Sequence, residues 1–251
     1  METAFGQTKK HMKKLFALLI FALSLGSAGF AQSDKDYKDL LTIFVSEKYE
    51  KCLYKAEGYT LGDDTKKDPL PYLFMSRCYF EMSKRDEFKE KYPNAFKDAL
   101  KFASKYGSKD KEKVYMTEYE DFFAELRKAA MAEAESMMDT EKFSKAKQIY
   151  DQLLDLDVND AGAQLMLGLA FTGLKSKKEA ETAIAKAKKI LVDKSAGQSK
   201  EQLQLLRDAL TRHATALSGA NKTLAKEWLD LGLEYFPDDK EYKVTYDSIA
   251  G

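Results

Sequence analysis

The chain has 251 residues, and its 41 Lys and Arg balance its 41 Asp and Glu, so the formal net charge is zero. This balance argues against a general nucleic-acid-binding protein, which would carry a clear basic excess. A hydrophobic share of 44% is enough to build a core. The chain has only two histidines, the residue that most often acts in acid–base catalysis. The sequence contains no nucleotide-binding loop, zinc motif or nucleophile elbow. We therefore expect a folded protein that is not an enzyme and needs no cofactor.

The first 31 residues have the order of a bacterial secretory signal. Four lysines between positions 9 and 14 precede the apolar run Leu15 to Leu25, and small residues follow up to Ala31. The apolar run is shorter than the roughly 20 residues that span a bilayer. We expect cleavage after Ala31 and a periplasmic or secreted mature protein without stable membrane insertion. An uncleaved anchor is the alternative, because the uncharged stretch continues to Ala31.

Residues 32–112 predict helical hairpins with irregular connections. Glu47 to Ala56 has the pattern of the second helix of a hairpin, and Pro71 to Tyr79 has that of the next first helix. The segment Ser83 to Tyr92 is too long for a tight turn, and Gly107-Ser108 indicates a further turn. We expect degenerate repeats in this part of the chain.

A regular repeat begins near Lys113, where apolar residues recur at helical spacing and strand-like alternation is absent. Three pairs of equivalent residues lie 34 positions apart: Ala134 and Gly168, Glu141 and Lys175, and Ala146 and Ala180. The alanine and glycine pairs mark places where two helices approach closely. Glu141 and Lys175 begin the turns between helices. We therefore predict a repeating helix–turn–helix unit over 113–251.

At this point the chain resembles the tetratricopeptide repeat (TPR) family, whose unit is a 34-residue helical hairpin. The matching positions are Leu167, Gly168, Phe171, Ala180 and Ala187, and then Ala225, Leu229, Gly232 and Pro237. The resemblance implies an all-α fold, a right-handed superhelical array of about five TPR-like hairpins with a C-terminal capping helix. It also implies that 113–251 continues the array of 32–112 as one domain.

Local signals agree with these boundaries. Asp160 is placed to cap the helix that follows it, and Ser199 opens a capping box with Gln202. Ser218 to Asn221 indicates a turn, and the tail Asp238 to Ile249 predicts the final helix. Two tyrosines at i,i+4 spacing in this tail are expected to cover the open end of the array.

The TPR resemblance also implies a function, a non-enzymatic scaffold that binds a protein or peptide in a concave groove. In that family the first helix of each hairpin lines the groove, and the corresponding residues here are Lys128, Met131, Glu135, Met138, Leu165, Leu169 and Thr172. Glu135 and Leu169 differ from the residues of the family's carboxylate-binding subset. This difference favours an apolar or helical ligand. We expect a protein or peptide partner in the cell envelope and no nucleic acid. The alternative is a structural subunit that docks permanently or self-associates through its helix faces.

Three further features leave two interpretations each. Cys52 and Cys78 form a disulfide in an exported protein, or they are two small buried hydrophobes. The aromatic residues of the first half fill an irregular core, or they form a recognition surface around Tyr72, Tyr79, Tyr115 and Tyr119. His213 is expected to be a helix residue that is partly packed or faces solvent, rather than a catalytic base.

Overall fold

The computed structural model describes residues 37–193 and 197–251, so the expected signal segment lies outside the described residues. Every regular element in these ranges is a helix, and the described residues form one compact unit. In chain order the helices are α2 (Lys38–Val45), α3 (Tyr49–Leu61), α4 (Pro69–Ser83), α5 (Asp86–Lys89), α6 (Ala95–Lys109), α7 (Glu120–Asp139), α8 (Phe143–Leu156), α9 (Ala161–Gly173), α10 (Lys177–Asp193), α11 (Lys200–Ser218), α12 (Lys222–Gly232) and α13 (Lys240–Ala250). The prediction of an all-α fold is confirmed.

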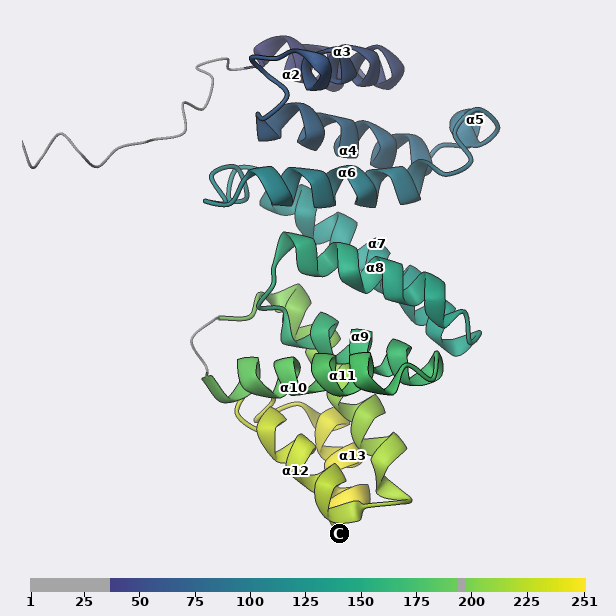
Figure 1. Cartoon of the computed structure of the whole chain (residues 1–251), viewed down its shortest axis with the longest axis vertical. Coiled ribbons are helices and arrows are strands. Elements are labelled where there is room, and N and C mark those ends of the chain that lie inside the picture. The colour runs from purple at the N-terminus through teal and green to yellow at the C-terminus, as the bar shows by residue number, and fades with distance from the viewer. Residues whose placement is uncertain (1–36, 194–196) are drawn as a thin grey trace, which may run out of the picture. The chain divides into compact units, whose positions relative to one another are not determined.

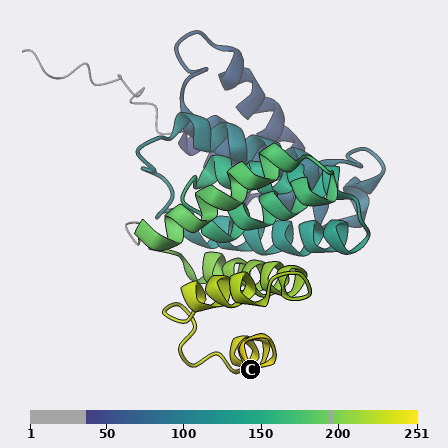
Figure 2. The ribbon, with the colours of Figure 1, turned by 60° about the horizontal axis from the view of Figure 1, so that its bottom comes forward.

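The helices pair into five hairpins, which are α2–α3, α4–α6, α7–α8, α9–α10 and α11–α12 (Figure 1). Neighbouring hairpins pack on one another, with α8 against both α6 and α9, and α9 against α11. Helix α13 packs on α11 and α12 at the C-terminal end, as Figure 2 shows. This is the predicted series of hairpins with a terminal cap. The handedness of the array stays a prediction.

The backbone at the turns gives independent support for the repeat. Glu141 in the α7–α8 turn has φ 57°, and Lys175 in the α9–α10 turn has φ 59°. Glu47, which precedes α3 in the first hairpin, has φ 57°. A left-handed conformation is uncommon for residues other than glycine. Its recurrence at the same place in three hairpins therefore indicates equivalent turns.

The second hairpin departs from the pattern in two places. The short helix α5 occupies the segment between α4 and α6, where the sequence predicted an interruption. The predicted turn at Gly107-Ser108 is wrong, because both residues lie inside α6. A Cβ on Gly107 would come within 2.7 Å of the Asp155 carbonyl oxygen. This glycine therefore serves a close contact between α6 and α8, and it does not end the helix.

Small residues set the distance between packed helices elsewhere in the stack. A Cβ on Gly168 would lie 2.6 Å from the Ile184 side chain of α10. A Cβ on Gly162 would lie 2.6 Å from the Leu206 backbone nitrogen of α11. Ala180, the repeat partner of Ala146, is buried at the same kind of contact. The predicted close approach of neighbouring helices is therefore present.

The predicted caps are also confirmed. The Asp160 carboxylate accepts a hydrogen bond from the Ala163 backbone N–H at 2.9 Å, and Ser199 and Gln202 form a complete capping box. At the C-terminal end, the buried Tyr242 hydroxyl donates to the Leu229 carbonyl oxygen at 2.7 Å. These bonds satisfy backbone groups that the ends of helices leave unpaired.

A pair of glycine substitutions tests the close helix packing. Gly162→Ala is expected to lower the free energy of unfolding by about 1–3 kcal/mol, because the new methyl group meets the backbone of α11. Gly58→Ala is the matched control, since nothing lies within 4 Å of its Cβ position inside α3. It is expected to raise stability by about 0.5–1 kcal/mol. Urea unfolding measures both, and equal effects would contradict the packing described above.

Candidate functional site

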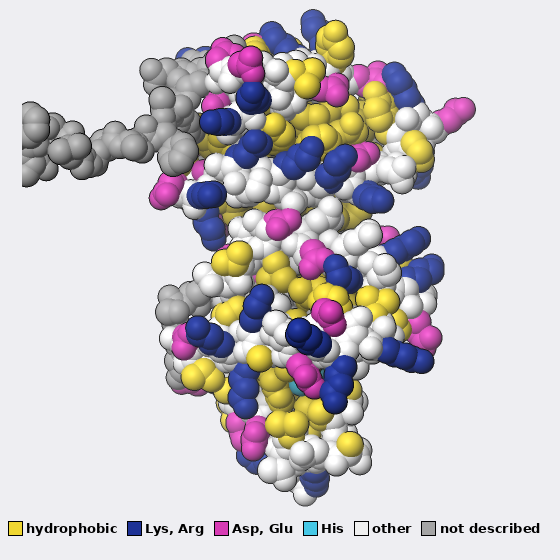
Figure 3. All heavy atoms as spheres, in the orientation of Figure 1, with side chains coloured by type: hydrophobic (Ala, Val, Ile, Leu, Met, Phe, Trp, Pro, Cys, Tyr) yellow, Lys and Arg dark blue, Asp and Glu magenta, His cyan; other side chains and the backbone are white. Residues whose placement is uncertain are grey.

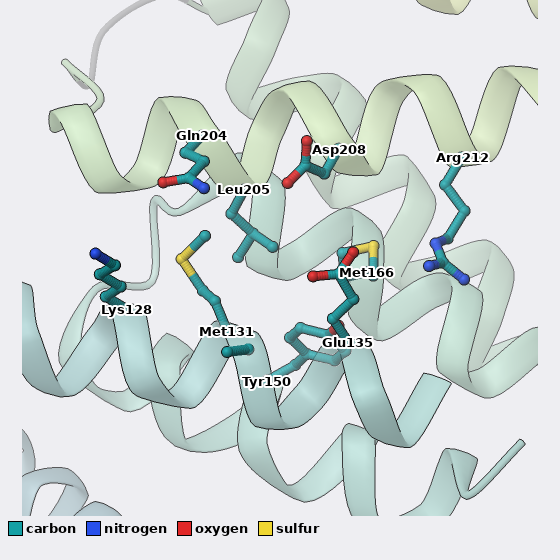
Figure 4. Close-up of a pocket in the computed structure, with 10 residues that line it drawn as sticks. Lys128, Met131, Glu135, Tyr150, Met166, Gln204, Leu205, Asp208 and Arg212 are labelled. Carbon is teal, nitrogen blue, oxygen red and sulfur yellow. The ribbon is translucent and has the colours of Figure 1, made fainter. Parts of the chain in front are cut away.

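A cavity of about 150 Å³ opens between α7 and α11, which are first helices of their hairpins (Figure 4). Helix α9, the first helix of the hairpin between them, contributes to the wall. The lining residues are Lys128, Met131, Ala132 and Glu135 of α7, Tyr150 of α8, Met166 of α9, and Gln204, Leu205, Asp208 and Arg212 of α11. We call this cavity the α7–α11 groove.

The floor of the α7–α11 groove is apolar. Met131, Met166 and Leu205 converge there from three helices, and each is less than a tenth exposed. Two of the three are methionines, whose unbranched side chains adapt to ligands of different shape. The floor can therefore accept an apolar side chain that enters from solvent.

Tyr150 adds one polar group to this floor. Among the described residues its hydroxyl has no hydrogen-bond partner. Burial raises the pKa of Tyr150, an effect that nearby Arg212 partly opposes. The hydroxyl therefore stays protonated at neutral pH and can donate a hydrogen bond to a ligand.

The rim of the groove carries charges of both signs. Lys128 and Glu135 are exposed on α7, and within the described ranges neither forms an ion pair. Arg212, on the α11 side, donates to the Asp139 carboxylate at 2.7 Å. The two unpaired side chains are seven residues apart, which is about 10 Å along a helix. They leave one cation and one anion available to a partner.

A buried ion pair links α7 to the start of α9. An Nη of Arg127 donates to the carboxylate of Asp160, whose side chain is 0% exposed. The same carboxylate caps α9. Burial raises the pKa of Asp160, and the adjacent guanidinium opposes this effect. The guanidinium and the backbone of α9 compensate the burial of Asp160, whereas Arg127 Nε has no hydrogen-bond partner among the described residues. The pair therefore links α7 to the start of α9 at some cost in free energy.

The structure brings together three of the predicted groove residues and separates the others. Lys128, Met131 and Glu135 line the α7–α11 groove. Leu165 and Met138 do not line the groove, since Leu165 is fully buried and Met138 is 6% exposed beside the core. The reason is that neighbouring helices cover both sides of α9, including the side that carries Leu165.

Leu169 and Thr172, near the C-terminal end of α9, do not reach the groove. Leu169 is half-buried against the core, and Thr172 is exposed. The Thr172 hydroxyl donates to the Gly168 carbonyl oxygen one turn earlier at 3.0 Å. Their contact with a ligand stays a prediction.

The sequence interpretation missed the α11 side of the groove. The second helices begin at Phe143, Lys177 and Lys222, so successive spacings are 177 − 143 = 34 and 222 − 177 = 45 residues. A prediction that repeats every 34 residues therefore does not place α11 correctly. The capping box at Ser199 marks the true start of α11 and was the signal that could have restored the register.

The aromatic residues of the first half are mainly core. Tyr72 is 8% exposed, and its hydroxyl donates to the Lys66 carbonyl oxygen at 3.0 Å. Tyr79, Tyr115 and Tyr119 are partly buried and pack against the same cluster. Tyr72 therefore belongs to the core, whereas a recognition surface that includes Tyr79, Tyr115 and Tyr119 stays a prediction.

Cys52 and Cys78 are free, buried thiols on the packed helices α3 and α4. The Cys52 thiol donates to the Leu40 carbonyl oxygen at 3.5 Å. A side-chain hydrogen bond with Cys52, and then burial, raise the pKa of the Cys78 thiol. The two thiols therefore lie side by side, and both the disulfide and the packed-hydrophobe interpretations stay predictions.

The described residues hold neither a metal cluster nor a membrane-spanning helix. In these ranges no group of three or more His, Cys, Asp or Glu is placed to hold a metal ion. None of the described helices combines the length and the apolarity that crossing a bilayer requires.

Two solved structures with TPR repeats are similar to this chain at low TM-scores. The TPR2AB-domain:pHSP90 complex of yeast Sti1 is 15% identical, with 84% of this chain and 83% of that chain covered and a TM-score of 0.32. The C-terminal part of a TPR repeat-containing protein from Cytophaga hutchinsonii is 13% identical, with 84% and 99% covered and a TM-score of 0.30. No family model and no curated protein matches the chain.

His213 of α11 lies in the core and not in the groove. Its ring meets the Trp228 ring edge-on, with centroids 4.7 Å apart, and burial lowers the pKa of His213 to about 4. An unfolded histidine has a pKa of about 6.5, so the unfolded chain binds more protons between these values. The contribution of His213 to the free energy of unfolding is therefore highest above pH 6.5, where its ring is neutral in both states. It decreases as the pH falls towards 4, because the unfolded chain takes up the proton first.

We expect His213→Phe to reduce this pH dependence while keeping a ring against Trp228. Between pH 7 and about 4, the wild type should lose up to about 3 kcal/mol more of its unfolding free energy than the variant. Urea unfolding at the two pH values measures the difference, in which the titration of carboxylates common to both proteins cancels. Parallel losses in both proteins would show that His213 titrates normally.

Proposed function

We propose that this protein is a non-enzymatic scaffold that binds a segment of a protein or peptide in the α7–α11 groove. The observation that supports this most is the combination of an adaptable apolar floor with unpaired charges on the rim. Apolar anchors that fill such a floor usually supply most of the binding energy, and polar rim groups set the orientation.

The groove suits a segment with one large apolar side chain between two charged positions. The apolar side chain would contact Met131, Met166 and Leu205 in the floor. Lys128 and Glu135 would pair with an acidic and a basic group of the partner. Lys128 and Ala132 also line a second, open hollow of about 590 Å³ on the other side of α7. A longer segment can therefore continue across α7.

The proposed location is the bacterial cell envelope. It is supported by the signal-like order of the first 31 residues, which would direct export and cleavage after Ala31. An exported scaffold would meet its partner in the periplasm or outside the cell.

The alternative, a subunit that self-associates or docks permanently, has one specific observation in its favour. Large apolar side chains are exposed on the first hairpin, including Val45 at 65%, Tyr54 at 80% and Leu61 at 78%. Such side chains at the end of an array can pack against a further helical surface. Light scattering separates the two functions, because a monomer without ligand favours the groove and a stable oligomer favours the alternative.

A matched pair of exposed alanines tests the groove. Ala132→Arg places a long side chain in the α7–α11 groove without removing any core contact. Ala185→Arg makes the same change on the exposed face of α10. A peptide is selected by the wild type from a displayed library, and its affinity is measured by fluorescence polarisation. Ala132→Arg is expected to weaken binding by about tenfold or more, about 1.4 kcal/mol, and Ala185→Arg to leave it unchanged.

Equal affinities for Ala132→Arg and the wild type would place the selected peptide elsewhere on the protein. Failure to select any peptide, with an oligomer in light scattering, would contradict the scaffold and favour the structural subunit. Circular dichroism of both variants confirms that the helices are intact.

A further inference from the structure

Helix α6 carries a row of lysines along its exposed face. Its members are Lys97, Lys101, Lys105 and Lys109, spaced four residues apart, and we call them the α6 lysine stripe. The first three are exposed, and Lys109 is half-buried. The same helix carries a single acidic residue, Asp98, although the whole chain is neutral. Figure 3 shows a row of dark blue side chains over α6, next to a yellow apolar patch. Positive charge is therefore concentrated on one helix.

The charges of the α6 lysine stripe are not neutralised within the described part of the chain. None of the four lysines forms an ion pair there. The Lys109 ammonium donates instead to the Lys66 carbonyl oxygen at 3.0 Å. Burial, and then repulsion from Lys105 and Lys67, lower the pKa of Lys109. An external anion would relieve this repulsion.

Aromatic rings hold the stripe in place. The Phe102 ring stacks on Tyr79 of α4, with centroids 5.6 Å apart and planes 7° from parallel. The ammonium groups of Lys101 and Lys105 lie 5.4 and 5.1 Å from the Phe102 centroid. Cation–π attraction restricts these flexible side chains, so a ligand meets them partly ordered and at a lower cost in entropy.

We propose that the α6 lysine stripe is a docking site for an acidic, extended segment of a partner protein. Residues four apart on a helix are about 6 Å apart along its axis. Alternate side chains of an extended peptide are about 6.6 Å apart. Carboxylates at every second position of such a segment therefore meet successive lysines of the stripe.

Two other polyanions fit the stripe less well. Single-stranded nucleic acid is held by bases that stack on open aromatic faces. The Phe102 ring is already engaged by Tyr79 and by two ammonium groups. A membrane surface is a uniform anionic sheet, and Asp98 lies among the lysines that would face it.

The stripe is separate from the proposed peptide-binding groove. It lies on α6, the second helix of its hairpin, whereas the groove lies between the first helices α7 and α11. The two surfaces share no lining residue. The proposed docking site does not depend on the proposed function of the groove. An experiment that contradicts one of the two proposals does not contradict the other.

A charge-reversal pair with a matched control tests the stripe. Lys101→Glu/Lys105→Glu reverses its centre, and Lys186→Glu/Lys189→Glu makes the same change of net charge on α10, another second helix. The probe is fluorescein-labelled poly-L-glutamate, and binding is followed by fluorescence polarisation at low salt. The stripe variant is expected to lose about tenfold or more in affinity, and the control to lose little.

Phe102→Leu tests whether the ring orders the ammonium groups. It keeps an apolar side chain next to Tyr79 and is expected to weaken binding about two- to fivefold. The proposal is overturned if wild type does not bind the probe, or if both charge-reversal pairs lose affinity equally. Tighter binding to oligo-deoxythymidine or to phosphatidylglycerol vesicles than to poly-L-glutamate would also overturn it, in favour of a nucleic acid or a membrane.

Discussion

The positions of α8, α10 and α11 depend on how α9 is buried between them. Its residues from Ala161 to Gly168 are all buried, because α8, α10 and α11 pack around it. Gly162 and Gly168 allow two of these neighbours to approach closely. The Arg127–Asp160 pair adds a polar link from the start of α9 to α7. Few side chains other than small or apolar ones satisfy these contacts, which explains the composition of α9.

The same packing creates the α7–α11 groove. Because α9 lies deeper than α7 and α11, these two helices face one another across a gap whose floor is apolar. Met131 and Leu205 are buried in this floor, so the apolar surface that a partner would contact is already assembled before it binds. On the second helix α6 the exposed face carries the α6 lysine stripe.

Much of this fold could be predicted from the sequence, because the signals are local. Each signal depends on residues that are close in the sequence. They are the helical periodicity, the 34-residue spacing of Ala146 and Ala180, and the caps at Asp160 and Ser199. Gly107 could not be assigned from sequence, because its role is a contact with α8 far along the chain. The groove was predicted on α7 and missed on α11. Repeat spacing cannot show a longer connection between hairpins, nor that neighbouring helices cover α9 on both sides.

Site-specific photo-crosslinking tests most directly whether α7 and α11 enclose a binding groove. A benzophenone amino acid replaces Gln204, on the α11 rim of the groove, or Glu227, on the exposed face of α12. Irradiation with a peptide that the protein binds is expected to give a covalent adduct from position 204 and none from position 227. An adduct from position 227 alone would show that partners bind the second helices, and would contradict the groove.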